Sequence, residues 1–139
     1  MPQSCVFCAI REGKLPASKI YEDDDVLAIM DIQPINPGHV LVLPKAHYGQ
    51  MKDLPASLSA KIFAVVKQVE EALWKTDAVP CAGTNILQNN GRIAFQEVHH
   101  VHVHVIPRVA GDGLKLRLQT QKTDRTELDE LSEVIAGYL

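Results

Sequence analysis

Residues 96–109 read QEVHHVHVHVIPRV and hold four of the chain's six histidines. From His100 onward histidine alternates with valine, and successive side chains of a β-strand point to opposite faces. We therefore expect a strand over residues 100–107, ended by Pro107, with a histidine face and a valine face. His99 falls in phase with the valines and is expected to take no part in a site. The histidine face consists of His100, His102 and His104.

Three imidazoles in a row favour a chemical role over a structural one, because six ring nitrogens would otherwise all need partners. A single metal ion held by all three is disfavoured. The Cα atoms of His100 and His104 would lie roughly 13 Å apart on a strand, whereas a metal–nitrogen bond is about 2.0–2.1 Å. A neutral imidazole is a good nucleophile at pH 7, and its neighbours can donate hydrogen bonds to an anion. The pattern therefore favours attack on phosphorus by one histidine while another binds a phosphate oxygen.

Periodicity predicts the remaining elements. One long helix is expected within residues 53–75, with Pro55 in its first turn. A terminal helix is expected over residues 124–138, where Asp124 and Glu127 suit the cap and its third-position partner. Its apolar face comprises Leu128, Leu131, Val134 and Ile135. Further strands are expected at residues 20–21, 26–30, 39–44 and 84–90. These elements indicate an α+β domain, an antiparallel sheet with the long helix and the C-terminal helix packed on it.

Composition narrows the class of protein. A chain of 139 residues fits one domain. The net charge of −3 argues against a general nucleic-acid binder, which would present a basic face. No apolar run approaches the roughly 20 residues that span a bilayer, so no membrane partner is expected. The N-terminus lacks the order of a secretory signal, and a cytoplasmic location is the default expectation.

The N-terminal stretch CVFCAIREG, expected to form a short helical turn, places Cys5 and Cys8 in a C-x-x-C spacing. This motif alone is half of a zinc site or a redox pair. A redox pair is expected between a strand and a helix, and no strand precedes it here. Two buried thiols without a metal remain an alternative. Cys81 has no partner in the sequence pattern.

The stretch from His100 to Ile106 resembles the H-φ-H-φ-H-φ-φ motif of the histidine-triad (HIT) superfamily of nucleotide hydrolases and transferases. DIQPINPGHVLVLPKAH at 31–47 resembles the other half of that family's site, and NNGRIAFQEV at 89–98 resembles its phosphate loop. The resemblance covers residues 5 to 108 and is nearest to the small bacterial HIT proteins related to the Hint branch. It implies a single HIT domain over residues 1–139. It also implies a homodimer, for which the long helix offers Phe63 and Val66 beyond a single apolar stripe.

The resemblance implies a role for each matching residue. His102 matches the nucleophile that attacks the α-phosphate and forms a covalent nucleotidyl-histidine. His104 matches the residue that bonds the phosphate and helps the leaving group, and His39 matches a fourth histidine beside them. Asp31 matches the acidic residue that holds the ribose hydroxyls, with Ile32 beside the base.

Four further positions are expected to line the substrate site. Asn89 and Gln96 match polar positions of the phosphate loop, whose amides around residues 95–97 can stabilise phosphoryl charge. Phe95 stands where the family often has glycine, which restricts the backbone if that position needs a positive φ. Glu97 stands where the family often has serine or threonine, and places a carboxylate near the phosphate.

Some relatives in this superfamily close a zinc site with a cysteine pair and two histidines. By this resemblance, Cys5, Cys8, His47 and His100 are expected to bind one structural Zn²⁺ as a Cys2His2 site. This assignment gives His100 a purpose that the chemistry of His102 and His104 does not.

The activity implied is hydrolysis at the α-phosphate of purine nucleoside phosphoramidates, aminoacyl-adenylates or ADP-like nucleotides. A dinucleoside polyphosphate hydrolase is the alternative enzyme. An alternative of another class is a zinc-stabilised nucleotide-binding module whose turnover is incidental. Negligible turnover with tight nucleotide binding would favour the module.

Overall fold

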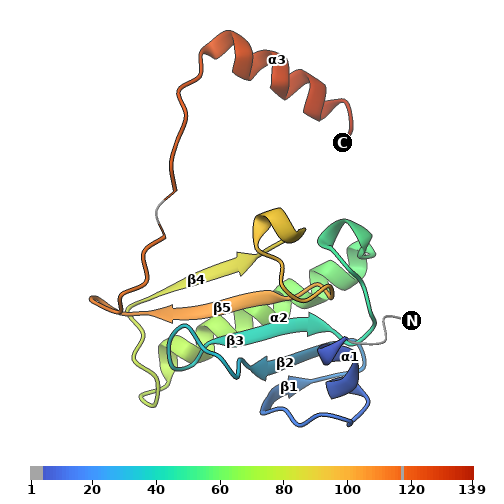
Figure 1. The fold of residues 1–139 in the computed structure, drawn as a ribbon, viewed down its shortest axis with the longest axis vertical. Helices are drawn as coiled ribbons and strands as arrows, with labels where there is room; N and C mark the ends of the chain where they lie inside the picture. Colours follow the sequence, from blue (N-terminus) through green and yellow to red (C-terminus); the bar gives the residue numbers. More distant parts are fainter. Residues whose placement is uncertain (1–4, 117) are drawn as a thin grey trace.

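The computed structural model describes residues 5–116 and 118–139 and contains a five-stranded antiparallel sheet with helices (Figure 1). The strand order is β1-β2-β3-β5-β4. The strands are β1 Lys19–Glu22, β2 Val26–Met30, β3 Val40–Pro44, β4 Gly83–Gln88 and β5 Val103–Arg108. The helices are α1 Val6–Arg11, α2 Ala56–Lys75 and α3 Arg125–Ala136, with single 3-10 turns η1 Met51–Asp53 and η2 Arg92–Ala94. The expected α+β class is confirmed.

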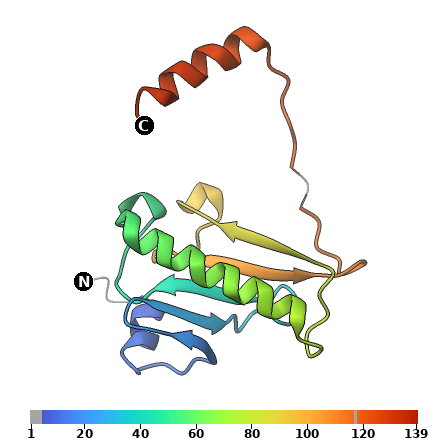
Figure 2. The ribbon, with the colours of Figure 1, turned by 180° about the vertical axis from the view of Figure 1, so that it is seen from behind.

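The two faces of the sheet are covered by different helices. Figure 2 shows α2 lying along one face. The residues that pack together there come from α2, β2, β3 and β5, and include Val40, Val42, Val103 and Val105. The short helix α1 covers part of the opposite face through Phe7 and Ile10, which pack with Leu27, Ile29, Leu41 and Leu43. The valine phase of the histidine stretch therefore faces α2, and the histidine phase faces the side of α1.

The strand that carries the histidines is shorter than its sequence pattern indicates. It begins at Val103, so His104 lies within β5 while His100 and His102 precede it. The sheet pairing ends there because the two neighbours of β5 have their last pairs at Val103, with Val42 of β3 and Gln88 of β4. The prediction of three histidines on one regular strand is therefore wrong, although Val101 is still buried in the same phase.

The C-terminal helix covers Arg125–Ala136, close to its predicted range of 124–138, but it does not pack on the sheet. The side chain of Asp124 accepts a hydrogen bond from the backbone N–H of Glu127 at 2.9 Å, as the capping pattern predicts. Every residue of α3 is exposed, and the helix stands away from the sheet at the end of an extended segment (Figure 1). Helix propensity and the cap define the helix locally, but its apolar face has no partner among the described residues of its own chain. No helix within the described ranges is long and apolar enough to cross a membrane.

Candidate functional site

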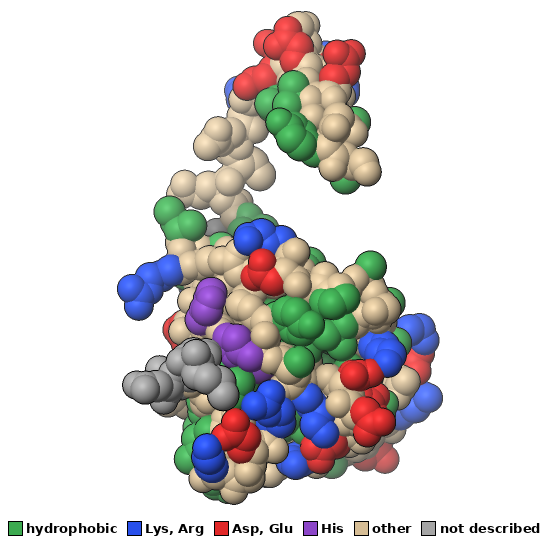
Figure 3. Space-filling view, turned by 90° about the vertical axis from the view of Figure 1, so that its right-hand side faces the viewer, with side chains coloured by type: hydrophobic (Ala, Val, Ile, Leu, Met, Phe, Trp, Pro, Cys, Tyr) green, Lys and Arg blue, Asp and Glu red, His purple; other side chains and the backbone are tan. Residues whose placement is uncertain are grey.

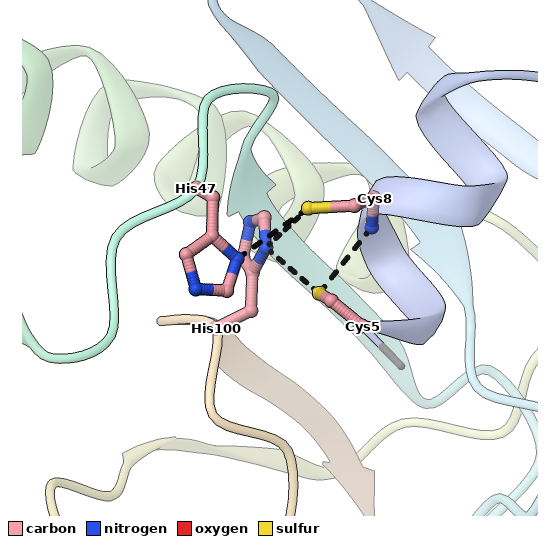
Figure 4. A group of neighbouring side chains, drawn as sticks. All are labelled: Cys5, Cys8, His47 and His100. Atoms are coloured by element: carbon pink, nitrogen blue, oxygen red, sulfur yellow. Dashed lines mark hydrogen bonds between the residues drawn. The ribbon is translucent and has the colours of Figure 1, made fainter. Parts of the chain in front are cut away.

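Two cysteines and two histidines from distant parts of the chain meet beside α1 (Figure 4). Their ligand atoms all lie within 4.8 Å of one another. Cys5 caps the N-terminus of α1 and Cys8 lies one turn later, so both thiols project from the same end of the helix. His47 follows β3, and His100 precedes β5. The fold thus brings together all four residues that the sequence predicts as metal ligands.

The spacing of this cluster matches a tetrahedral metal centre. Zn–S bonds of about 2.3 Å and Zn–N bonds of about 2.0–2.1 Å put tetrahedral ligand atoms roughly 3.3–3.8 Å apart. The Sγ of Cys5 lies 3.3 Å from Nδ1 of His100, and the Sγ of Cys8 lies 3.4 Å from Nδ1 of His47 and 3.7 Å from Nδ1 of His100. Burial, and then the neighbouring Cys5, raise the pKa of the Cys8 thiol. A cation bound here would displace that proton.

His100 presents the correct nitrogen to this cluster. Its Nε2 lies 2.8 Å from the backbone oxygen of Pro44, and a carbonyl oxygen can only accept a hydrogen bond. Burial lowers the pKa of His100 to about 4, so the ring is neutral at pH 7. A neutral ring that donates from Nε2 has a bare lone pair on Nδ1, and this atom faces the two sulfurs. His100 is thus prepared as a metal ligand by its own hydrogen bond.

His102 has the opposite tautomer. Its Nδ1 lies 2.7 Å from the backbone oxygen of His100 and must donate to it. Nε2 is therefore the bare nitrogen of the neutral ring. The ring is buried, and its centroid lies 4.9 Å from that of His104. The backbone carbonyl supplies the fixed acceptor that a nucleophilic imidazole needs and that the sequence pattern did not identify.

A chain of hydrogen bonds fixes the proton positions of His39 and His104. The backbone N–H of Ile35 donates to Nδ1 of His39 at 3.1 Å, so Nε2 of His39 carries the ring proton. That nitrogen lies 2.9 Å from Nδ1 of His104 and donates to it. His104 therefore carries its own proton on Nε2. The sequence predicts the pair of histidines, but not the amide that sets both tautomers.

Burial is the main cause that keeps these three rings neutral. It lowers the pKa values of His39, His102 and His104, because a cation is disfavoured away from water. The pKa of His104 falls to about 4, with further contributions from His102 and His39. For His102 the backbone bond to His100, and then the charges of Asp31 and Glu97, act in the raising direction but do not overcome burial. The site therefore places a neutral His102 with a bare Nε2 beside a neutral His104.

Asp31 lies beside His39, at the edge of the hydrogen-bonded pair of His39 and His104. One carboxylate oxygen accepts the backbone N–H of Gln33 at 2.8 Å, and the other lies 3.6 Å from Nε2 of His39. Ile32 beside it is 90 % exposed, which leaves its side chain free to contact a ligand. Gly38 sets the approach to His39, because its φ is +90° and an added Cβ would lie 2.6 Å from a methyl carbon of Val79.

The loop between β4 and β5 has a strained backbone at Phe95. Its φ of 68° is the only positive value among the described non-glycine residues, and this conformation costs an ordinary residue about 1–2 kcal/mol. The position therefore does need a positive φ, as the comparison with glycine suggested. The Phe95 ring is largely exposed. Asn89 donates from its amide to the Phe95 carbonyl at 3.4 Å.

The backbone amides and the Gln96 side chain that were expected to face a phosphate form hydrogen bonds within the protein instead. The amides of Phe95 and Gln96 donate to the carbonyls of Arg92 and Gly91, so they do not form the expected anion-binding amides in this conformation. The Gln96 side chain is buried: it accepts from the amide of Gly91 and donates to two carbonyls. Gln96 thus braces the loop. Glu97 is exposed and close enough for its charge to affect His102.

The sequence pattern did not identify Phe7 as a residue of the site. Phe7 lies between the two cysteines on α1, is buried, and sets its ring edge-on to His100 and His102 at centroid distances of 5.5 and 5.1 Å. Its position inside the C-x-x-C motif was the available signal, but an apolar residue there also suits an ordinary core. His99 is exposed and lies outside the group of Cys5, Cys8, His47 and His100, which we call the metal cluster.

Comparisons with known proteins agree with this architecture. The HIT domain family matches residues 12–111. The chain is 38 % identical over 139 residues to adenosine 5'-monophosphoramidase HNT1 of Candida albicans, covering 98 % of this chain and 91 % of that protein. A crystal structure of a HIT family protein from Bacillus anthracis is 33 % identical, with a TM-score of 0.93 and coverage of 100 % and 99 %. That of a Zn-bound histidine triad family protein from Mycobacterium smegmatis is 40 % identical, with a TM-score of 0.76 and coverage of 94 % and 97 %.

The family match over residues 12–111 includes β1 to β5 and the three histidines His39, His102 and His104. It also includes His47 and His100 of the metal cluster, whereas Cys5 and Cys8 precede it. The family match over residues 12–111 and the similarity of the whole chain to the Bacillus anthracis structure identify the same fold. The chain belongs to the HIT family.

Proposed function

We propose that the protein is a nucleotide hydrolase that acts at the α-phosphate of purine nucleoside phosphoramidates, aminoacyl-adenylates or ADP-like nucleotides. One observation carries this proposal. The carbonyl of His100 holds the proton of His102 on Nδ1, which leaves a buried, neutral Nε2 lone pair beside a second imidazole. This is the arrangement that nucleophilic attack requires. The naming of the Candida relative as an adenosine 5'-monophosphoramidase supports the substrate class.

The reaction proceeds in two displacements. Nε2 of His102 attacks the α-phosphorus, a bond forms between them, and the bond from phosphorus to the leaving group breaks. The leaving atom is nitrogen in a phosphoramidate and oxygen in an aminoacyl-adenylate or ADP, and a leaving amine takes its proton from solvent. Water then attacks phosphorus and displaces Nε2 while its proton passes to solvent, which yields the nucleoside monophosphate and restores the neutral ring. Nε2–H of His104 donates to a phosphoryl oxygen throughout, and the Ile35–His39 chain holds that proton in place.

The remaining residues are proposed to bind the substrate or to stabilise the site. Asp31 accepts from the ribose hydroxyls, and Ile32 contacts the base. Asn89, Phe95 and Glu97 border the leaving group. Cys5, Cys8, His47 and His100 would hold a structural Zn²⁺, which would tie α1 to the segment after β3 and to the segment before β5. The Zn-bound relative supports this assignment.

A turnover panel tests the substrate class. Purified protein is assayed with adenosine phosphoramidate, lysyl-adenylate, ADP and a diadenosine polyphosphate. We expect the phosphoramidate or the aminoacyl-adenylate to give the highest kcat/KM. Preference for the diadenosine polyphosphate would favour the alternative hydrolase. Tight AMP binding without turnover of any of the four would favour a nucleotide-binding module.

The pH dependence of turnover should show the lowered pKa of His102. Because burial disfavours the imidazolium, the neutral nucleophile persists as the pH falls below the ordinary histidine pKa of about 6.5. We expect the acid limb of kcat/KM, which reports the free enzyme, to lie below pH 6.5. The measurement is kcat/KM from pH 4 to 8, corrected for non-enzymatic hydrolysis. Half-maximal activity at or above pH 6.5 would contradict it.

The protein is proposed to act as a homodimer, because a second copy can cover its unpartnered apolar surface. The face of α3 comprises Leu128, Leu131, Val134 and Ile135, which are 41–62 % exposed. Figure 3 shows apolar side chains on one side of this helix and acidic ones on another. On the body, Phe63 and Trp74 of α2 and Ile86 of the edge strand β4 are exposed, whereas Val66 is buried and cannot contribute. Before the segment that leads to α3, Asp112 pairs with Arg108 at 2.6 Å.

Light scattering at micromolar concentration should give about twice the chain mass of 15.3 kDa. Leu131→Asp, which places a charge in the apolar face of α3, should shift the mass toward that of one chain. Glu130→Gln on the neighbouring exposed position is the matched control and should stay dimeric. A monomeric parent, or a fully dimeric Leu131→Asp, would contradict the role given to α3.

A further inference from the structure

The peptide unit between His100 and Val101 is held at both of its polar atoms. Its carbonyl oxygen accepts from Nδ1 of His102 at 2.7 Å, and its N–H, that of Val101, donates to the carbonyl of Tyr48 at 2.7 Å. Because the peptide is planar, rotating it would move both atoms together. The orientation of this one plane therefore decides whether His102 has a fixed acceptor, and hence which of its nitrogens is bare.

Both ends of this arrangement lie next to the metal cluster. The side chain of His100, the residue whose carbonyl is used, presents Nδ1 to Cys5 and Cys8. Tyr48, whose carbonyl receives the N–H, directly follows His47, which presents Nδ1 to Cys8. The segments that carry the peptide and its partner are thus the two segments that a metal at this cluster would join. These residues lie outside any regular strand, so no sheet ladder fixes them.

A third contact runs through α1. Phe7 lies between the two cysteines, and its ring touches His100 and His102 edge-on. Since α1 is only six residues long, the thiols at its N-terminal end and the Phe7 ring belong to the same short helix and cap. A change in how the thiols are held therefore reaches the ring of His102 directly.

We propose that a metal ion at Cys5, Cys8, His47 and His100 sets the tautomer and orientation of His102 through the His100–Val101 peptide and Phe7. Loss of the metal releases this peptide, and His102 then exchanges between its two tautomers as a free imidazole does. The kinetic half of this inference rests on the proposed hydrolase function. His100, Tyr48 and Phe7 are positioning residues here, and the metal centre acts on kcat and leaves substrate binding to Asp31 and its neighbours.

The test reads the tautomer directly, by ¹H–¹⁵N NMR of protein labelled at histidine nitrogen. Four samples are compared: the zinc-loaded parent, the parent treated with a chelator, Cys8→Ser, and the matched control Cys81→Ser, whose thiol lies outside the cluster. In the loaded parent and in Cys81→Ser, His102 should show one protonated nitrogen, Nδ1. In the metal-free samples its two nitrogens should give averaged or broadened signals, with kcat at least about tenfold lower and KM within about twofold. Added zinc should restore the parent and not Cys8→Ser.

Unchanged His102 signals in folded, metal-free protein would overturn the proposal, as would failure of the parent to bind zinc. If no sample turns over any substrate, the hydrolase function fails, and the NMR comparison still decides the coupling. If the metal-free protein does not fold, Phe7→Leu provides the test, because it keeps all four ligands and most of the apolar volume. It should retain zinc, broaden the His102 signals and lower kcat several-fold at similar KM. Zinc-loaded Phe7→Leu with parental signals would contradict the coupling.

Discussion

Replacing His102 by alanine is expected to abolish turnover, with a loss of at least about 4 kcal/mol in transition-state stabilisation, or roughly a thousandfold in kcat. The reason is that the buried Nε2 of His102 is the nitrogen left bare by the bond to the His100 carbonyl. His104→Ala should slow turnover less, because it removes a donor and keeps the nucleophile. The measurement is single-turnover kinetics with an adenosine phosphoramidate.

The control for this substitution is His99→Ala, which removes a neighbouring histidine whose side chain is exposed and outside the metal cluster. It should keep activity within a few-fold of the parent. Binding of AMP to His102→Ala, measured by calorimetry, separates a lost nucleophile from a collapsed pocket. Near-parental turnover by His102→Ala would show that histidine is not the nucleophile and would return these residues to a binding role.

Removal of zinc is expected to cause the largest loss of stability. A ligand that binds only the folded state stabilises it by about 4 kcal/mol when its free concentration is a thousandfold above Kd. For a domain of this size each kcal/mol shifts the melting temperature by roughly 3–5 °C. Chelation should therefore lower the melting temperature by about 10–20 °C. The reason is that a metal at Cys5, Cys8, His47 and His100 would tie α1, which is only six residues long, to the rest of the fold.

Elemental analysis of protein purified without added metal should give one zinc per chain. Cys8→Ser should lose the zinc and melt at the lower temperature of the chelated parent. Cys81→Ser should keep both the metal and the melting temperature, since its thiol lies outside the cluster. Equal zinc in the parent and in Cys8→Ser, or no zinc in the parent, would contradict a Cys2His2 site.

Most helices and strands could be predicted because each depends on the pattern of residues within its own segment. Alternation of valine and histidine identifies the core face of β5, and the spacing of apolar residues identifies α2, which packs as expected. The start of β5 was wrong by three residues, since it depends on where the pairing of β5 with β3 and β4 stops. The position of α3 was also wrong: its amphipathic face predicts a partner, but not whether that partner belongs to the same chain.

The candidate site is predictable by residue type and less so by geometry. The four metal-cluster residues meet as expected. The tautomers could not be predicted, because they depend on backbone groups of Ile35, Pro44 and His100 that carry no residue-specific signal. Gln96 was expected at the phosphate, yet its polar atoms brace the loop. The roles of the individual residues, the single-domain description of residues 1–139 and the cytoplasmic location stay predictions.

The most direct test of a nucleophilic His102 is mass spectrometry of enzyme quenched rapidly after mixing with an adenosine phosphoramidate, under conditions that spare the acid-labile P–N bond. We expect an adenylyl adduct on the peptide that contains His102, present in the parent and in His104→Ala and absent from His102→Ala. An adduct on another residue, or turnover without any adduct in samples quenched at several times, would contradict a covalent path through His102.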